Sequence, residues 1–140
     1  EYFALIRELV RIRPDQKIHF EPGRSIVAQC GSLITKVLYI KKGSNTTFAV
    51  VDAGMTDLIR PALYQAHHEI QNLTSGGKIE KYDVVGPICE SSDTFAKFIE
   101  LPETRRGDIL AIRSAGAYGE IMASRYNLRD LPGVVFSDEL

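Results

Sequence analysis

Several features that mark specialised classes of protein are missing from this chain of 140 residues. No apolar run approaches the ~20 residues that a membrane-spanning helix needs, and we expect no signal peptide at its beginning. The 17 basic residues are balanced by 18 acidic ones, so the basic excess typical of nucleic-acid binders is absent. We therefore expect neither a membrane nor a nucleic acid as a partner. With 44% hydrophobic and 25% charged residues, the composition excludes a disordered tail and fits a globular domain.

Cysteine is scarce as well. Cys30 and Cys89 lie far apart, and no second cysteine or histidine stands at the spacing of a metal site. This pattern excludes a disulfide framework and a zinc site, so we expect no bound metal. A reducing compartment, the cytoplasm, is the expected location. The Asn-X-Thr triplets at Asn45 and Asn72 are interpreted as chance matches, because we expect no secretion signal.

The first 24 residues have the pattern of one α/β unit. Apolar residues recur every three or four positions up to Val10, which predicts a helix, and Pro14 ends it. The alternation over residues 17–20 predicts a short strand that runs into a Pro-Gly turn. One helix and one strand cannot bury their own faces. We therefore interpret residues 1–24 as the end of a larger α/β unit.

From residue 25 onward the chain has a different character, and the change falls at residues 24–31. Gly43-Ser44-Asn45 predicts a hairpin, because Gly and Asn tolerate positive φ. Many short strands with turn signals between them predict a mainly β fold, an antiparallel sandwich or barrel with short helices. The predicted strands are residues 33–40, 46–52, 79–85, 109–113 and 134–136, and helical turns are predicted at 58–68 and 117–123.

Two places carry side chains suited to an anionic ligand. Arg24 ends the turn Glu21-Pro22-Gly23-Arg24 at a predicted strand end, where Gly23 permits close backbone approach and the guanidinium offers a bidentate donor. Arg60 and Tyr64 are four residues apart and share one helix face, which suits a carboxylate. The alternative is a solvated turn and an ordinary surface helix.

Two further places suit proton transfer or close ligand contact. Cys89 follows a predicted strand and precedes Glu90. The adjacent carboxylate disfavours the thiolate, so Cys89 suits a proton donor better than a nucleophile. Tyr118 stands between small residues that let a ligand come close. The alternative is a small core cysteine and a packed tyrosine in a tight turn.

Together and in this order, these features resemble the diaminopimelate decarboxylase family, within the pyridoxal-phosphate-dependent decarboxylases of the alanine-racemase and ornithine-decarboxylase fold group. The resemblance extends over most of the chain from Glu21 to about Asn127. Residues 60–64 and 89–91 are its specific signals, whereas the Pro-Gly-Arg turn is shared more widely in the group. The matching landmarks are residues 21–24, 51–55, 57–64, 83–93 and 108–119.

The resemblance implies two domains and a shared active site. Residues 1–24 would be the last helix and strand of a (β/α)₈ barrel that binds pyridoxal 5′-phosphate, and residues 25–140 would be an incomplete C-terminal β domain. The family's Schiff-base lysine lies earlier in the barrel and has no counterpart here, so we expect this chain to be inactive alone. A homodimer with active sites shared between subunits is implied.

The resemblance also assigns roles to the candidate residues. Glu21 and Gly23 would hold the cofactor, and Arg24 and Tyr118 would contact both cofactor and substrate. Three more roles concern the substrate, meso-diaminopimelate, which would yield L-lysine and CO₂ in lysine biosynthesis. Arg60 and Tyr64 would bind its distal carboxylate, Glu90 would accept from its distal ammonium, and Cys89 would return the proton to carbon after CO₂ leaves.

Three other readings stay open. A decarboxylase of another basic amino acid, such as ornithine or arginine, would not need Arg60 and Tyr64 as a carboxylate clamp. A catalytically silent homologue with a regulatory role would be expected to have lost reactive groups, and Cys89 and Glu90 are present. A free-standing β-barrel binding module leaves the opening helix-strand unit unexplained.

Overall fold

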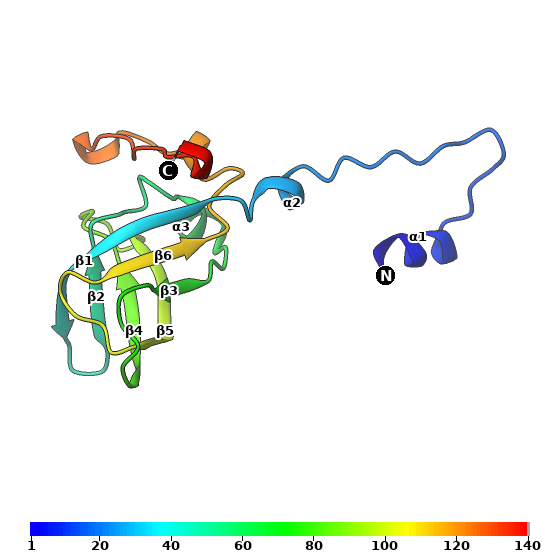
Figure 1. Cartoon of the computed structure of the whole chain (residues 1–140). Helices are drawn as coiled ribbons and strands as arrows, with labels where there is room; N and C mark the ends of the chain where they lie inside the picture. The colour runs from blue at the N-terminus through cyan, green and yellow to red at the C-terminus, as the bar shows by residue number, and fades with distance from the viewer. Residues whose placement is uncertain (140) are drawn as a thin grey trace.

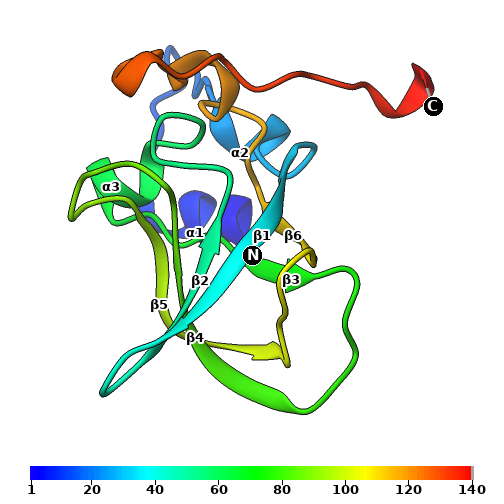
Figure 2. The same ribbon diagram turned by 90° about the vertical axis from the view of Figure 1, so that its left-hand side faces the viewer.

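The computed structural model describes residues 1–139; Leu140, the last residue of the predicted β domain, lies outside them. Six strands form one sheet in the order β3-β6-β1-β2-β4-β5. Its end strands β3 and β5 contact each other, so the sheet curves into a nearly closed barrel, as Figure 2 shows. The strands are β1 (Ser32–Lys42), β2 (Thr47–Val51), β3 (Ile70–Asn72), β4 (Ile79–Val85), β5 (Thr94–Pro102) and β6 (Ile109–Arg113).

The core lies inside this curved sheet, which we call the sheet region (residues 32–113). Val37, Val51, Val84 and Leu110 are fully buried there and come from four different strands. Tyr82 is also buried, and its hydroxyl both donates to Glu80 and accepts from the Thr104 amide. The phenol therefore joins the core without leaving its polar atom unpaired.

The mainly β fold class is confirmed, and several elements match their predictions. Residues 79–85 and 109–113 form strands with the predicted bounds. The strand predicted over residues 33–40 lies inside β1, and the strand predicted over residues 46–52 is β2, which is one residue shorter at each end. The predicted hairpin joins β1 to β2 through a bond from Gly43 N to Thr46 O of 2.8 Å. The expected cause of the hairpin, a positive φ at Gly43 or Asn45, is wrong, because neither residue has a positive φ.

Other details of the prediction are wrong. β2 and β4 pair in parallel, although every other neighbouring pair is antiparallel as expected. Residues 134–136 form no strand. The helix predicted over 58–68 is only α3 (Arg60–Tyr64), because Gln65 takes a left-handed conformation with φ of 52° and ends it. The helical turn predicted at 117–123 is reduced to the 3₁₀-helix η1 (Glu120–Met122).

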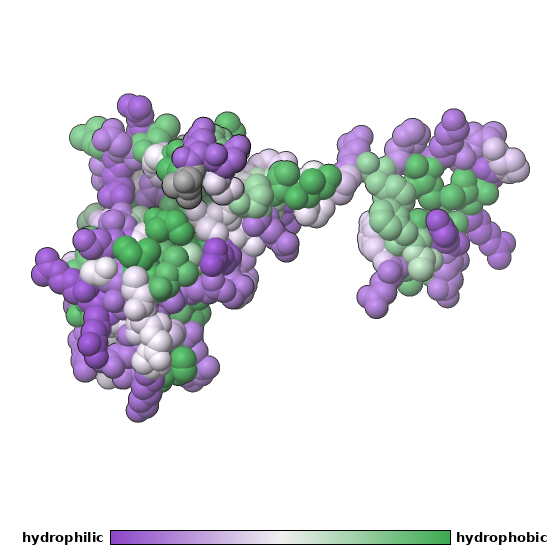
Figure 3. All heavy atoms as spheres, in the orientation of Figure 1, coloured by the Kyte–Doolittle hydropathy of each residue, from purple (hydrophilic) through white to green (hydrophobic). Residues whose placement is uncertain are grey.

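Residues 1–23, the N-terminal arm, lead away from the sheet region (Figure 1). Helix α1 (Tyr2–Leu9) forms as predicted, but none of its residues is buried. Its apolar side chains gather on an exposed surface of the arm in Figure 3. The strand predicted over residues 17–20 does not form, because no neighbouring strand supplies hydrogen bonds there. Among residues 1–139, none of the helices combines the length and the apolar character that a bilayer crossing requires.

The chain after β6, residues 114–139, is the C-terminal segment. It crosses one end of the sheet region (Figure 1). The Ser124 amide donates to Thr56 O at 2.8 Å, which ties the segment to the connection between β2 and α3. Besides η1, the segment holds the 3₁₀-helices η2 (Tyr126–Leu128) and η3 (Ser137–Glu139).

Candidate functional site

Four of the predicted site residues line one pocket with a volume of about 500 Å³. Arg24 comes from α2 (Arg24–Val27), Arg60 and Tyr64 come from α3, and Tyr118 comes from the C-terminal segment. Ala66 and Met122 complete the lining. Two guanidinium groups, two phenols and no carboxylate thus converge from three separate parts of the chain.

The pair Arg60 and Tyr64 owes its arrangement to local helix geometry. Pro61 stands in the first turn of α3, where a missing amide hydrogen costs no helical bond. The guanidinium carbon of Arg60 lies over the Tyr64 ring at 5.3 Å from the ring centroid. The predicted shared face is therefore confirmed, and the stacked guanidinium keeps its N–H groups free to bind an anion.

Tyr118 reaches the pocket through an unusual backbone. Its φ is 62°, in the left-handed region that residues other than glycine seldom adopt. A close crossing of two glycines stands next to it, since a Cβ added to Gly31 would lie 2.7 Å from Gly116. A Cβ on Gly116 would lie 2.2 Å from Val27 O. Only glycine allows the chain to pass there.

This crossing joins the helix of Arg24 to the loop of Tyr118. The carbonyl groups at the end of α2 accept hydrogen bonds from the C-terminal segment instead of from water. The bonds run from Ala115 N to Gly31 O (2.9 Å), from Gly116 N to Ala28 O (2.9 Å) and from Ala117 N to Val27 O (3.1 Å). The backbone segments that carry Arg24 and Tyr118 are thereby joined to each other.

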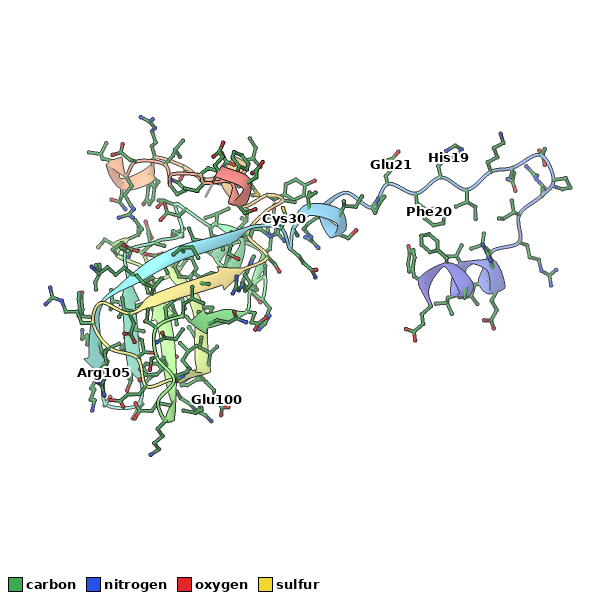
Figure 4. The ribbon with its side chains drawn as sticks, in the orientation of Figure 1. His19, Phe20, Glu21, Cys30, Glu100 and Arg105 are labelled. Atoms are coloured by element: carbon green, nitrogen blue, oxygen red, sulfur yellow. The ribbon has the colours of Figure 1, made fainter. Side chains whose placement is uncertain are left out.

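The other two predicted site residues of the turn, Glu21 and Gly23, lie outside the pocket lining. Gly23 has a positive φ of 47°, which is consistent with the sharp bend expected of a Pro-Gly turn. Glu21 is exposed, and Figure 4 shows it on the N-terminal arm beside His19 and Phe20. Cys30, also labelled there, lies where α2 meets β1, and its thiol donates to Val27 O at 2.9 Å.

Cys89 and Glu90 are not in this pocket. They lie on the loop between β4 and β5 (residues 86–93), where both are exposed. Asp93 fixes the loop, because its two carboxylate oxygens accept from the amides of Ile88 and Met55, each at 2.6 Å. Burial raises the pKa of Asp93, and these two hydrogen bonds oppose the rise. Cys89 and Glu90 therefore stand on a loop with a fixed base.

Two residues of the C-terminal segment escaped the sequence analysis, and no local pattern distinguishes them. The Tyr126 hydroxyl donates a hydrogen bond to Glu90 Oε1. Arg129 donates to Asp52 O at 2.6 Å and lies 3.6 Å from the carboxylate of buried Asp57. Both come from the C-terminal segment. Among residues 1–139, no group of His, Cys, Asp or Glu has a geometry that could hold a metal ion.

The family described as pyridoxal-dependent decarboxylase, C-terminal sheet domain, matches residues 24–116. The chain therefore belongs to this family, as the sequence predicted, and pyridoxal phosphate is the family's cofactor. The cationic pocket fits a cofactor and substrate that carry phosphate and carboxylate groups.

More specific similarities point to one kind of decarboxylase. The chain is 63% identical over 139 residues to the diaminopimelate decarboxylase of Bacteroides thetaiotaomicron, which covers 99% of this chain and 36% of that protein. A structure of diaminopimelate decarboxylase from Helicobacter pylori with L-lysine is 59% identical, with a TM-score of 0.71 over 76% of this chain and 26% of that one. The corresponding M. jannaschii structure with L-lysine is 46% identical, with a TM-score of 0.78 over 80% and 26%. The chain thus spans about a quarter to a third of the length of these relatives.

Proposed function

We propose that this chain is the C-terminal part of a pyridoxal-phosphate-dependent decarboxylase that converts meso-diaminopimelate to L-lysine and CO₂. The observation that carries the proposal is the convergence of Arg24, Arg60, Tyr64 and Tyr118 on one pocket. The 63% identity to a diaminopimelate decarboxylase supports the same substrate.

The pocket explains a preference for a substrate with a distal carboxylate. Arg60 presents a planar guanidinium, which binds a carboxylate through two parallel hydrogen bonds. The Tyr64 ring stacks against the guanidinium, with its centroid 5.3 Å from the guanidinium carbon, and the Tyr64 hydroxyl is a further donor. Glu90 accepts from the distal ammonium. Ornithine and lysine lack the distal carboxylate, so they leave the Arg60 charge without its partner.

Arg24 and Tyr118 face both the cofactor and the substrate in this proposal, and Glu21 and Gly23 support the cofactor from the turn before α2. Bound pyridoxal phosphate supplies an electron sink for the electron pair that remains when CO₂ leaves. The crossing at Gly31 and Gly116 joins the backbone segments that carry Arg24 and Tyr118, so the two groups act on the same bound molecule.

Cys89 holds the proton that returns to the substrate carbon, at its Sγ atom. Because Cys89 and Glu90 are exposed and lie outside the pocket of their own chain, we propose that they complete the site of a second copy in a homodimer. Both cysteines are free, which suits a reducing cytoplasm.

We propose that residues 1–24, the N-terminal arm together with Arg24, belong to the end of a (β/α)₈ barrel and that the β domain begins at residue 25. The exposed apolar residues of α1, among them Phe3 and Leu9, would pack against the rest of that barrel. The lysine that carries the cofactor in the family would lie in the same barrel. The chain alone is therefore expected to release no CO₂.

Two alternatives remain. A decarboxylase of another basic amino acid would use Glu90 but would have no use for the clamp of Arg60 and Tyr64. A catalytically silent regulatory homologue would have the same fold, but it would not need the exposed thiol of Cys89. The intact clamp and thiol favour the diaminopimelate decarboxylase.

The experiment uses the full-length parent chain loaded with pyridoxal phosphate. CO₂ release is followed from meso-diaminopimelate, ornithine, lysine and arginine in parallel. Release from meso-diaminopimelate alone is the expected result. Preference for a substrate without a distal carboxylate would support the first alternative, and no release from any substrate would support the silent homologue.

A further inference from the structure

The side chain of Glu90 contacts a part of the chain that lies outside the matched family domain. That match ends at residue 116, ten positions before Tyr126. The Tyr126 hydroxyl nevertheless donates to Glu90 Oε1. The hydrogen bond and the negative charge of Glu90 raise the pKa of Tyr126, so the phenol stays protonated and remains the donor.

The C-terminal segment is anchored on both sides of this contact. Before it, the Ser124 amide donates to Thr56 O at 2.8 Å. After it, Arg129 donates to Asp52 O at 2.6 Å. Between them, Asn127 turns the chain through a left-handed conformation with φ of 57°, which asparagine tolerates well. The backbone on either side of Tyr126 is thus held by bonds that do not depend on Glu90.

The partner of the contact is equally well held. Asp93 fixes the base of the loop that carries Glu90 through the amides of Ile88 and Met55. The loop and the C-terminal segment are both attached to the connection between β2 and α3, through Met55 and Thr56 respectively. Tyr126 and Glu90 therefore meet between two separately anchored segments.

One consequence concerns the geometry of the carboxylate. An exposed glutamate samples several rotamers, and binding a cation then costs the entropy of fixing one of them. A donor on Oε1 selects one orientation in advance and leaves Oε2 for another donor, such as an ammonium group.

We propose that Tyr126 is a positioning residue for Glu90 and sets the affinity of the site for the substrate's distal ammonium. This inference rests on the proposed function, because it takes Glu90 as the group that binds that ammonium. Tyr126 itself does not contact the reacting atoms in this proposal, so it affects binding and leaves the chemical step alone.

The test compares Tyr126→Phe, Glu90→Gln and the double variant in the full-length parent loaded with pyridoxal phosphate. Steady-state kinetics with meso-diaminopimelate separate KM from kcat, and calorimetry measures the Kd of L-lysine without turnover. Tyr39→Phe is the matched control, because Tyr39 is an exposed tyrosine on β1, and β2 separates β1 from β4, the strand that leads into the loop of Glu90.

We expect Tyr126→Phe to raise KM and the Kd of L-lysine by about tenfold, the effect of one hydrogen bond to a charged group. kcat should stay within about twofold, because uniform binding and not transition-state stabilisation is lost. In the double variant, adding Tyr126→Phe to Glu90→Gln should raise KM and the Kd of L-lysine little further, since the two residues act as one unit.

Three other outcomes would overturn the inference. An active parent whose KM and Kd do not respond to Tyr126→Phe would refute the positioning role and leave the proposed function standing. A loss of kcat alone would do the same, because it would place Tyr126 in the chemical step. A parent that neither releases CO₂ nor binds L-lysine would refute the proposed function, and the inference with it.

Discussion

The N-terminal arm and the sheet region contain the same kinds of apolar side chain but use them differently. Leu9 on α1 is 70% exposed, whereas Leu110 on β6 is fully buried. In the arm, the aromatic rings of Tyr2, Phe3 and Phe20 contact one another edge to face and little else. In the sheet region, apolar side chains from several strands enclose one core.

The difference shows which structure a short segment can form by itself. Helix α1 forms without burial because its hydrogen bonds lie within the segment. Residues 17–20 form no strand because a strand takes its hydrogen bonds from a neighbour. A helix in the arm is therefore a local property, and a strand there requires the parts of the fold that would flank it.

The largest expected effect separates the two regions directly. Leu110→Ala removes a fully buried side chain and should lower the free energy of unfolding by about 3 kcal/mol. Leu9→Ala, the matched change in the arm, should alter it by less than about 0.5 kcal/mol. Urea unfolding followed by circular dichroism measures both. Equal losses would mean that the arm packs on the sheet region in solution.

A second prediction concerns the stretch between the two regions, where α2 meets the C-terminal segment. Gly116→Ala places a Cβ 2.2 Å from Val27 O and should destabilise the chain by about 2 kcal/mol. Gly76→Ala is the matched control, because a Cβ there meets no atom within 4 Å. The same unfolding assay applies. An unchanged stability of Gly116→Ala would show that α2 can leave the C-terminal segment at no cost.

A smaller, pH-dependent effect is expected where the C-terminal segment meets the sheet region. The Arg129 charge lowers the pKa of Asp93, which burial raises above its usual value. Protonation of Asp93 thus favours folding, and this contribution is lost as the pH rises through the folded-state pKa. Arg129 opposes that loss because its charge stabilises the ionised carboxylate. Arg129→Met should therefore lower the free energy of unfolding by about 1.5 kcal/mol near pH 7.

The cost of Arg129→Met should shrink as the pH falls through the pKa of Asp93, because the attraction ends when the carboxylate is neutral. Urea unfolding at neutral and acidic pH measures this, and Arg125→Met is the control, since Arg125 is exposed on the same segment. A cost independent of pH would mean that Arg129 acts through its contacts with Asp52 O and Asp57 and not through the charge of Asp93.

What the sequence predicted follows the same division between local and distant interactions. Residues 79–85 and 109–113 were predictable because breakers mark their ends: Gly76-Gly77 and Gly86-Pro87 flank the first, and Gly107-Asp108 precedes the second. The strands β3 and β5 escaped prediction: β3 is only three residues long, and β5 carries Lys97 and Glu100 on its exposed side. Their place in the sheet depends on partners far along the chain.

The candidate site divides in the same way. Arg60 and Tyr64 were predictable as neighbours because four residues make about one helical turn. The meeting of Arg24 with Tyr118 followed only from the family resemblance, since no local pattern joins two residues so far apart. Tyr126 and Glu90, 36 positions apart, were missed because nothing near Tyr126 marks it as more than a surface aromatic.

The parallel pairing of β2 with β4 has a consequence for how this domain can diversify. Parallel neighbours cannot be joined by a hairpin, so the chain must leave the sheet after Val51 and travel back before Ile79. Helix α3 lies on that return path and contributes no buried residue. The proposed carboxylate clamp of Arg60 and Tyr64 therefore lies on a connection that the topology requires. If the proposed function holds, point changes in α3 would alter substrate selectivity while strand register and core composition stay constant.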